Sequence, residues 1–387
     1  MGCTHTRMPT TPHAALGSDS NLRVEPVSCA LSPERLVALP AQGANAFLWL
    51  LGIAGLAVST AAALAATNEP AARPKPAPVV ELQITAGGIT ETNKLPAAPD
   101  GFPRPAQNVF EAQLALDRLG ISPGSLDGVI GGQTRSALRA YQQKQGLPVT
   151  GDWDAATKVQ LLLNAPPCAS YVVTSNDVAR LQPLSPTWLG KSKQTALDYE
   201  TILELVAEKS HAHPNLVRRL NPAIDWTNVT TGTILQLPEA ARPGLGAKAA
   251  FITIHLADKT LEAFDENTNL LAHFPCSIGR LVEKRPVGQL HVEVVAPDPN
   301  YTFDPKVFPE STEGRQLQGK LILPPGPNNP VGVVWIGLDK PGYGIHGTPG
   351  PEQVGRTESH GCFRLANWNA EFLLKLVAIG TPVYVEP

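Results

Sequence analysis

The chain has 387 residues, of which 43% are hydrophobic and 17% charged, and its net charge is −3. A chain of this length exceeds one compact core, so two or three domains are expected. The near-neutral charge and the lack of a long basic run exclude nucleic acid as the main partner. The 38 prolines are too many for an even spread, which indicates Pro-rich connectors.

The first signal along the chain is an uncharged apolar segment at residues 44–66, which follows an N-terminal tail at residues 1–43. It is about long enough to span a bilayer. Its end at residues 63–65 has the small-x-small pattern Ala-Leu-Ala, which a signal peptidase cleaves. We predict either a cleaved signal peptide or an N-terminal membrane anchor. In both cases the rest of the chain is exported, to the periplasm or the cell envelope.

The cysteines divide at this segment. Cys3 and Cys29 precede it, and Cys168, Cys276 and Cys362 follow it. An odd count in an oxidising compartment indicates that at least one thiol is kept free. Cys276 lies in a strand-like run and is interpreted as a small buried side chain, and Cys168 as incidental.

A Pro-rich linker at residues 67–107 leads into a helical module at residues 108–165. Apolar residues at spacings of three and four predict a helix that starts near Asn108. A second helix is predicted after an N-cap at Thr134. Asp154 is predicted to cap a third helix, which would carry Val159, Leu162 and Leu163.

The turn between the first two helices carries a specific motif. The pattern D-G-x-x-G-x-x-T, followed by A-x-x-x-[FY]-Q, resembles the three-helix peptidoglycan-binding domain. The matching residues are Asp127, Gly128, Gly131, Thr134, Ala137, Tyr141 and Gln142. Most of them are turn or core positions, so a spacer that binds nothing remains the alternative.

A second small module is predicted at residues 168–240. Residues 199–209 have a helical period, Pro214 starts another helix, and residues 232–238 read as a closing strand. The order strand, helix, helix, strand resembles a LysM glycan-binding module. His211 and His213 show no partner pattern and are expected at the surface.

From residue 249 to 387 the pattern becomes mainly β, with one clear helix near residues 368–377. The predicted strands are 251–256, 261–264, 270–278, 290–295, 331–338 and 381–385. The fold class is therefore multi-domain: a mainly β domain preceded by a small three-helix module and a small α+β module.

Two motifs in this β domain carry chemistry. One contains His346 and Gly347, and the other is Ser-His-Gly-Cys-Phe-Arg at residues 359–364. A thiol attacks as thiolate and needs a nearby base or positive field. Glycines let the backbone approach a substrate, and backbone N–H groups at such a turn stabilise an oxyanion. A guanidinium two residues beyond the cysteine can hold a carboxylate or brace the loop.

This region resembles the L,D-transpeptidase catalytic domain (YkuD-like) over roughly residues 249–386. Ser359, His360, Gly361, Cys362 and Arg364 fit its [ST]-H-G-C-[IV]-R signature. The phenylalanine after the cysteine replaces a small aliphatic residue, which is a packing change. Two further stretches, 285–288 and 326–332, resemble the family's Thr-Pro-x-Gly turn and its substrate-side loop. The resemblance implies a β-sandwich or barrel.

The resemblance also implies a role for each residue. Cys362 would be the nucleophile and His346 the general base, oriented by a backbone carbonyl such as that of Gly347. His360 would position the substrate or shape the oxyanion site, with N–H groups near Gly361. The other substrate-side residues would be Ser359 and Arg364.

The implied reaction attacks the bond between the third residue of a peptidoglycan stem peptide, a diamino acid, and its fourth, D-alanine. A thioester forms, D-alanine leaves, and an acceptor amine takes the acyl group. No cofactor or metal is implied. The expected partners are peptidoglycan stem peptides and glycan, and the membrane if residues 44–66 stay uncleaved.

Three alternatives remain. Water as the acceptor would make the chain an L,D-carboxypeptidase. An inert Cys362 would leave a non-catalytic wall-binding protein. A zinc site of His346, His360 and Cys362 is conceivable, but the motif offers no fourth ligand.

Overall fold

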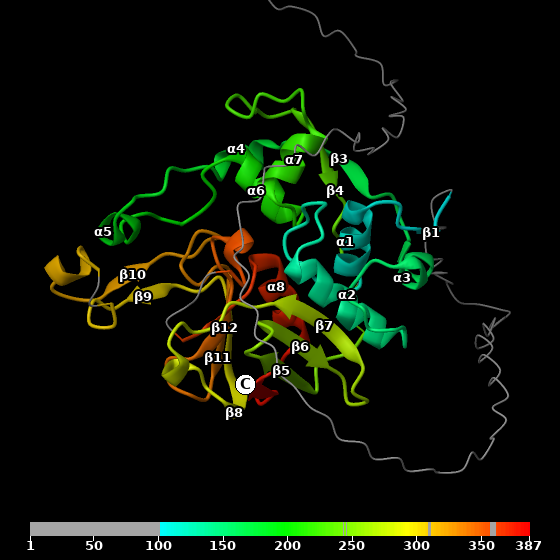
Figure 1. Cartoon of the computed structure of the whole chain (residues 1–387). Helices are drawn as coiled ribbons and strands as arrows, with labels where there is room; N and C mark the ends of the chain where they lie inside the picture. The colour runs from blue at the N-terminus through cyan, green and yellow to red at the C-terminus, as the bar shows by residue number, and fades with distance from the viewer. Residues whose placement is uncertain (1–100, 243, 245, 309–310, 357–360) are drawn as a thin grey trace, which may run out of the picture. The chain divides into compact units, whose positions relative to one another are not determined.

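The computed structural model describes residues 101–387 apart from 243, 245, 309–310 and 357–360 (Figure 1). The N-terminal tail, the apolar segment 44–66 and nearly all of the linker lie outside the described residues. In the described part of the chain, no helix is both long and apolar enough to cross a membrane. The signal or anchor at residues 44–66 therefore stays a prediction.

The first module contains the three predicted helices. They are α1 (Val109–Arg118), α2 (Gly132–Lys144) and α3 (Ala155–Gln160). The strand β1 (Arg104–Pro105) precedes them and pairs with β2 (Leu162–Leu163), which follows them. The Asp154 side chain accepts from the Thr157 N–H, as predicted for an N-cap. The Thr134 prediction was wrong, because α2 begins earlier and its N-cap is Gly131. Val159 lies in α3 as predicted, but the predicted extent of this helix was wrong, because Leu162 and Leu163 form β2.

The signature residues of this module are held by two glutamines. Gln113 Oε1 accepts from the N–H groups of Asp127 and Gly128, at 3.1 and 2.7 Å, and its Nε2 donates to Asp127 and Thr134. Gly128 has a φ of +75°, which favours glycine. Gln142 is fully buried and binds the turn that precedes α3. The motif therefore builds the module's turns.

The second module begins and ends with a strand, as predicted, but it has four helices between the strands where two were predicted. Its elements are β3 (Cys168–Val172), α4 (Ser175–Ala179), α5 (Trp188–Lys191), α6 (Ile202–Lys209), α7 (Pro214–Leu220) and β4 (Ile234–Pro238). The strands β3 and β4 pair antiparallel around α6 and α7. Pro214 is the first residue of α7, as predicted. The helix expected from residue 199 starts at Ile202, after the N-cap Thr201, whose side chain accepts from the Glu204 N–H.

The third module is built on an eight-stranded sheet in the order β13-β12-β11-β8-β14-β5-β6-β7. The strands are β5 (Phe251–His255), β6 (Thr260–Phe264), β7 (Leu270–Pro275), β8 (Gly288–Pro297), β11 (Val334–Leu338), β12 (Gly344–His346), β13 (Phe363–Arg364) and β14 (Pro382–Glu386). Most neighbours are antiparallel, but β14 with β5 and β12 with β13 are parallel. The mainly β prediction is confirmed.

Helix α8 (Asn367–Leu376) packs against this sheet. Along β14, Val383 and Val385 are buried while the residues between and after them are exposed, which is the period of two of a half-buried strand. Leu373 and Leu376 of α8 belong to the same apolar core. Burying each such side chain stabilises the fold by roughly 1.5–3 kcal/mol. The short pair β9 (Tyr301–Phe303) and β10 (Leu321–Leu323) stands outside the large sheet.

Three 3-10 turns complete the third module: η1 (Val282–Lys284), η2 (Gly314–Gln316) and η3 (Pro351–Gln353).

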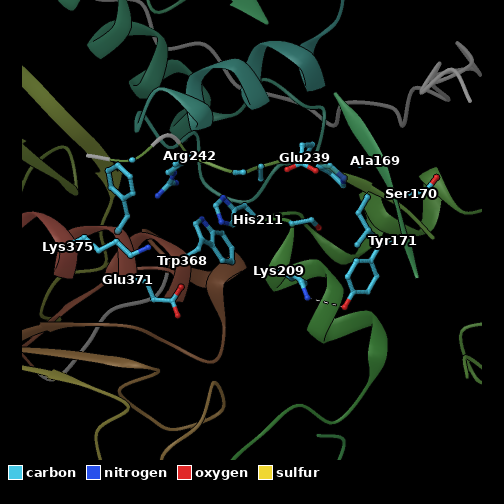
Figure 2. A pocket seen from close by; sticks show the side chains of 17 residues that line it. Ala169, Ser170, Tyr171, Lys209, His211, Glu239, Arg242, Trp368, Glu371 and Lys375 are labelled. Atoms are coloured by element: carbon cyan, nitrogen blue, oxygen red, sulfur yellow. Dashed lines mark hydrogen bonds between the residues drawn. The ribbon is translucent and has the colours of Figure 1, made fainter. Parts of the chain in front are cut away.

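A buried ionic cluster joins the three modules. Asp117 of α1 accepts from Arg242 Nη2 at 2.5 Å and contacts His211 Nδ1 at 2.7 Å. Arg242 Nη2 also donates to Asn369 of α8 at 2.7 Å. His211 stacks on Trp368 and lines a pocket of about 390 Å³ with it (Figure 2). The surface prediction for His211 was wrong, because its carboxylate partner lies in another module and cannot be read from local sequence.

Candidate active site

Strand pairing brings the two chemical motifs together. β12 and β13 are parallel neighbours, with Ile345 opposite Phe363 and His346 opposite Arg364. Cys362 comes directly before β13, so it lies beside the start of β12. The backbone of Arg364 exchanges two hydrogen bonds of 2.9 Å with Ser277, which fixes this edge of the sheet.

These residues open onto a cleft of about 570 Å³. His346, Gly361, Cys362 and Arg364 line one part of it. The remaining wall includes six aromatic residues: Trp188, Tyr301, Phe303, Phe308, Trp335 and Tyr343. A largely apolar cleft with few polar groups is the usual form of a small-molecule or peptide site.

His346 is held in one orientation. Its Nδ1 lies 2.6 Å from the Gly347 carbonyl, which can only accept, so Nδ1 carries the proton. Its ring stacks on Trp335. Burial lowers the pKa of His346 to about 4, the charge of Arg364 acts in the same direction, and the Gly347 carbonyl opposes both. At neutral pH the imidazole is therefore neutral and Nε2 carries a lone pair.

Cys362 carries a thiol outside any disulfide and is partly exposed. Its Sγ lies 3.5 Å from the Gly342 carbonyl. Burial raises the pKa of Cys362, while a hydrogen bond from the Gly344 backbone and the charge of Arg364 oppose that rise. Cys276 differs, because it is wholly buried and its pKa is raised by desolvation with little opposition.

Two glycines allow the chain to fold tightly behind His346. A Cβ on Gly347 or on Gly332 would collide with Oδ1 of Asn367. Gly332 also has a φ of +62°, which disfavours other residues. The glycine of the His-Gly pair is thus required by packing.

The remaining predicted site residues fall into two groups. Gly361 and Arg364 line the cleft, whereas Ser359 and His360 lie outside the described residues. Among the residues that the structure does describe, no group of three or more His, Cys, Asp or Glu side chains is placed to hold a metal ion.

The two stretches that resemble family features differ in their contact with the cleft, since only the second contributes lining residues. Arg285 Nε donates to the Gly279 carbonyl at 2.6 Å, which closes the first turn. In the second loop only Pro330 and Val331 reach the cleft. The rest of that loop is bonded to the second module, with Asn328 Nδ2 donating to Glu204 at 2.6 Å.

Sequence reasoning missed Trp188 at the cleft. It belongs to α5 of the second module and stacks on Phe303 with ring centroids 4.4 Å apart. The N–H groups of Trp188 and Leu189 donate to the Glu313 carboxylate, both at 2.8 Å. A tryptophan in a polar stretch carries no local signal for such a contact.

Comparison with known proteins identifies two of the modules. Residues 249–385 match the family model of the L,D-transpeptidase catalytic domain (YkuD), and residues 105–161 match that of a putative peptidoglycan binding domain. The second module is not covered by either match.

The chain is also similar to individual proteins that are named L,D-transpeptidases. The probable L,D-transpeptidase YbiS of Escherichia coli is 31% identical over 166 residues, which are 42% of this chain and 53% of that protein. The putative L,D-transpeptidase YkuD of Bacillus licheniformis is 25% identical over 185 residues, 48% of this chain and 93% of that protein. The solved L,D-transpeptidase of Xylanimonas cellulosilytica covers 73% of this chain and 98% of its own, at 16% identity and a TM-score of 0.31.

The chain spans about half the length of the first of these relatives. The match to the catalytic family nevertheless covers the whole of the eight-stranded sheet except its last residue, and both chemical motifs lie within it. The chain therefore contains a YkuD-type L,D-transpeptidase catalytic domain, preceded by a peptidoglycan-binding domain.

Proposed function

We propose that this chain is an exported L,D-transpeptidase that acts on peptidoglycan stem peptides through a thioester on Cys362. One observation carries the proposal. A thiol and a neutral imidazole of fixed tautomer line the same cleft from adjacent strands. Nucleophile, base and an orienting group for the base are the three parts that this chemistry requires.

In the acylation step, Sγ of Cys362 attacks the carbonyl carbon of the third stem residue. Thiol and imidazole are both neutral in the empty cleft, so the proton leaves sulfur as the S–C bond forms. It passes to His346 Nε2 and then to the nitrogen of the departing D-alanine as the C–N bond breaks. The charge of Arg364 favours the developing thiolate. Backbone N–H groups near Gly361 would stabilise the oxyanion.

In the second step, an acceptor amine attacks the thioester carbon. His346 Nε2 takes the proton that the amine loses, and the thiolate takes that proton as the C–S bond breaks. We propose that an amine outcompetes water here, because it is the stronger nucleophile toward a thioester. The aromatic wall of the cleft also limits the access of water.

We propose that the two N-terminal modules, at residues 108–165 and 168–240, hold the enzyme on the wall. Binding of this kind raises the effective concentration of neighbouring stems. The support is the family match of the first module and, in the second, the antiparallel pair of β3 and β4 with the helices α6 and α7 between them in the chain.

The test is to incubate the purified protein with disaccharide-tetrapeptide and to measure the masses of protein and products. The wild type and Cys276→Ala should gain an acyl group and yield cross-linked dimer, whereas Cys362→Ala should gain none. An acyl adduct on Cys362→Ala would refute the mechanism. Tripeptide without dimer, at every acceptor concentration, would make the enzyme a carboxypeptidase. A protein that binds wall but leaves the substrate intact would be a non-catalytic binder.

A further inference from the structure

Behind the base lies a chain of hydrogen bonds that the catalytic motif does not contain. Asn367, the first residue of α8, is 1% exposed. Its Oδ1 accepts from the Thr348 N–H at 3.0 Å and from the Val333 N–H at 3.4 Å. The Thr348 N–H belongs to the same peptide group as the Gly347 carbonyl, which accepts from His346 Nδ1. Asn367 therefore fixes the plane of the peptide that orients the imidazole.

The orientation of the Asn367 amide is set from the other side. Its Nδ2 donates to both carboxylate oxygens of Glu208, at 3.0 and 3.2 Å, and to the Pro327 carbonyl at 3.2 Å. A flipped amide would turn its oxygen toward a carboxylate and a carbonyl, and its NH2 toward two N–H donors. Buried polar groups need partners of the right kind, so Glu208 selects the orientation that suits the peptide.

Glu208 does not belong to the catalytic domain. It lies on α6 of the second module and also accepts from the Tyr199 hydroxyl at 2.9 Å. Its surroundings disfavour a charge, because burial together with Glu371 and Glu204 raises the pKa of Glu208 to about 7. The other charged or titratable side chains around it are Asp177, Arg180, Lys209 and His211. A carboxylate kept in such a place, with donors aimed at it, is suited to the role of a fixed acceptor.

We infer that Glu208 and Asn367 are positioning residues for the reaction, through which the second module sets the Gly347–Thr348 peptide and the orientation of His346. The inference rests on the proposed function, since it assigns a task to the base that the proposal names. It goes beyond wall binding, because it makes the second module part of the catalytic apparatus even for a soluble substrate.

The experiment measures thioester formation on a soluble tetrapeptide substrate in the full chain. Glu208→Gln keeps the size of the side chain but sets an NH2 against the donors of Asn367 or Tyr199. Asn367→Asp sets a carboxylate against Glu208. We expect each to lower the acylation kcat roughly tenfold to a hundredfold with KM within about threefold, since misplacement of a catalytic group acts on the chemical step.

A compensating double variant separates positioning from general damage. In Glu208→Gln with Asn367→Asp, the Gln NH2 donates to one Asp oxygen while the other accepts from Thr348 and Val333. We expect it to recover at least half of the loss in log kcat, which independent damage would not do. Glu200→Gln is the control: Glu200 belongs to the second module, where it accepts from the Leu184 N–H, and the kcat of this variant should stay within about twofold of wild type.

Failure of this inference and failure of the proposed function give different results. Wild-type kcat in both single variants, or no recovery in the double variant, would overturn the positioning role while the thioester mechanism stands. If the wild type forms no thioester, nitrogen NMR of His346 still decides: the Nδ1-protonated tautomer should dominate in the wild type and be mixed in Glu208→Gln. An unchanged tautomer would reject the inference.

Discussion

The first module and the catalytic domain both carry a specific sequence motif. The polar side chains of the first motif form internal hydrogen bonds, whereas those of the second line a cleft. In the first module, Gln142 is fully buried and bonds to Thr150, Asp152 and Thr157. In the catalytic domain, His346 donates from Nδ1 to the Gly347 carbonyl and lines a cleft together with Cys362. A motif whose polar side chains all form internal hydrogen bonds stabilises the fold. A motif that leaves reactive atoms at a cleft can serve catalysis.

The two cysteines of the catalytic domain differ in the same way, although they lie close to each other. Cys276 and Cys362 lie on neighbouring segments, since Ser277 pairs with Arg364. Cys362 lines the cleft, and both the Gly344 backbone and the charge of Arg364 favour its thiolate, whereas Cys276 lies outside the cleft and has one such contact, with the Arg364 backbone. Residue type alone does not distinguish them, whereas position and electrostatic surroundings do.

The largest expected effect concerns the base. His346→Ala should slow acylation by roughly two to four orders of magnitude, the usual scale of general base catalysis. Because the pKa of His346 is lowered to about 4, the imidazole is neutral above that pH and becomes protonated below it. The acid limb of the wild-type acylation rate should therefore lie near pH 4. A limb near 6.5, the ordinary value for histidine, would contradict the buried-base assignment.

A smaller effect is expected where a motif residue is structural. Gln142→Ala removes the side chain that accepts from the Gly151 N–H and donates to the Thr150 and Thr157 hydroxyls, which costs roughly 1–3 kcal/mol of folding free energy. The measurement is the midpoint of thermal or urea unfolding, and kcat on a soluble substrate is the control that should not change. If stability were unaffected while wall binding was lost, the contrast between the two motifs would be reversed.

The features that could be predicted from the sequence are those that depend on residues close together in the chain. Asp154 as a cap and Pro214 at a helix start are local, and both are confirmed. The ion pair of His211 and the bond between Glu208 and Asn367 join distant segments, and neither has a local period or motif. The pairing of β12 with β13 also joins distant segments, and it becomes known only from the sheet in the structure.

The cleft shows the same limit. The sequence placed Cys362 and His346 in one constellation through a family motif, but it offered nothing for Trp188, which reaches the cleft from another module. An aromatic wall built from separate segments is a property of packing. Such a residue is found only when the tertiary structure is known.

Trp188 gives a test of intermediate size. Trp188→Ala should raise KM for the stem peptide roughly fivefold to thirtyfold with kcat little changed, because it removes about 1–2 kcal/mol of aromatic contact. Leu189→Ala is the matched control, since Leu189 is exposed and does not line the cleft. Equal KM values in the two variants would show that the second module contributes no wall to the bound substrate.

The last prediction concerns Glu208, whose polar contacts are internal like those of Gln142, but which acts through Asn367 on the peptide beside His346. Its folded pKa of about 7 lies above the ordinary value of 4.5. The folded chain then binds more protons than the unfolded chain between pH 4.5 and 7. Glu208 therefore destabilises the fold above pH 7, and this cost is relieved as the pH falls through that window, by less than about 1.4 kcal/mol per pH unit. Other groups, such as Glu262 with its pKa lowered to about 2, titrate elsewhere, so the difference between wild type and Glu208→Gln isolates this contribution.

Urea unfolding at pH 5, 6, 7 and 8 should give a difference in unfolding free energy that widens with pH up to about 7 and then levels off, with the wild type losing stability relative to the variant. A difference independent of pH would mean that Glu208 is ionised throughout, and its carboxylate would then be a permanent anchor for Asn367.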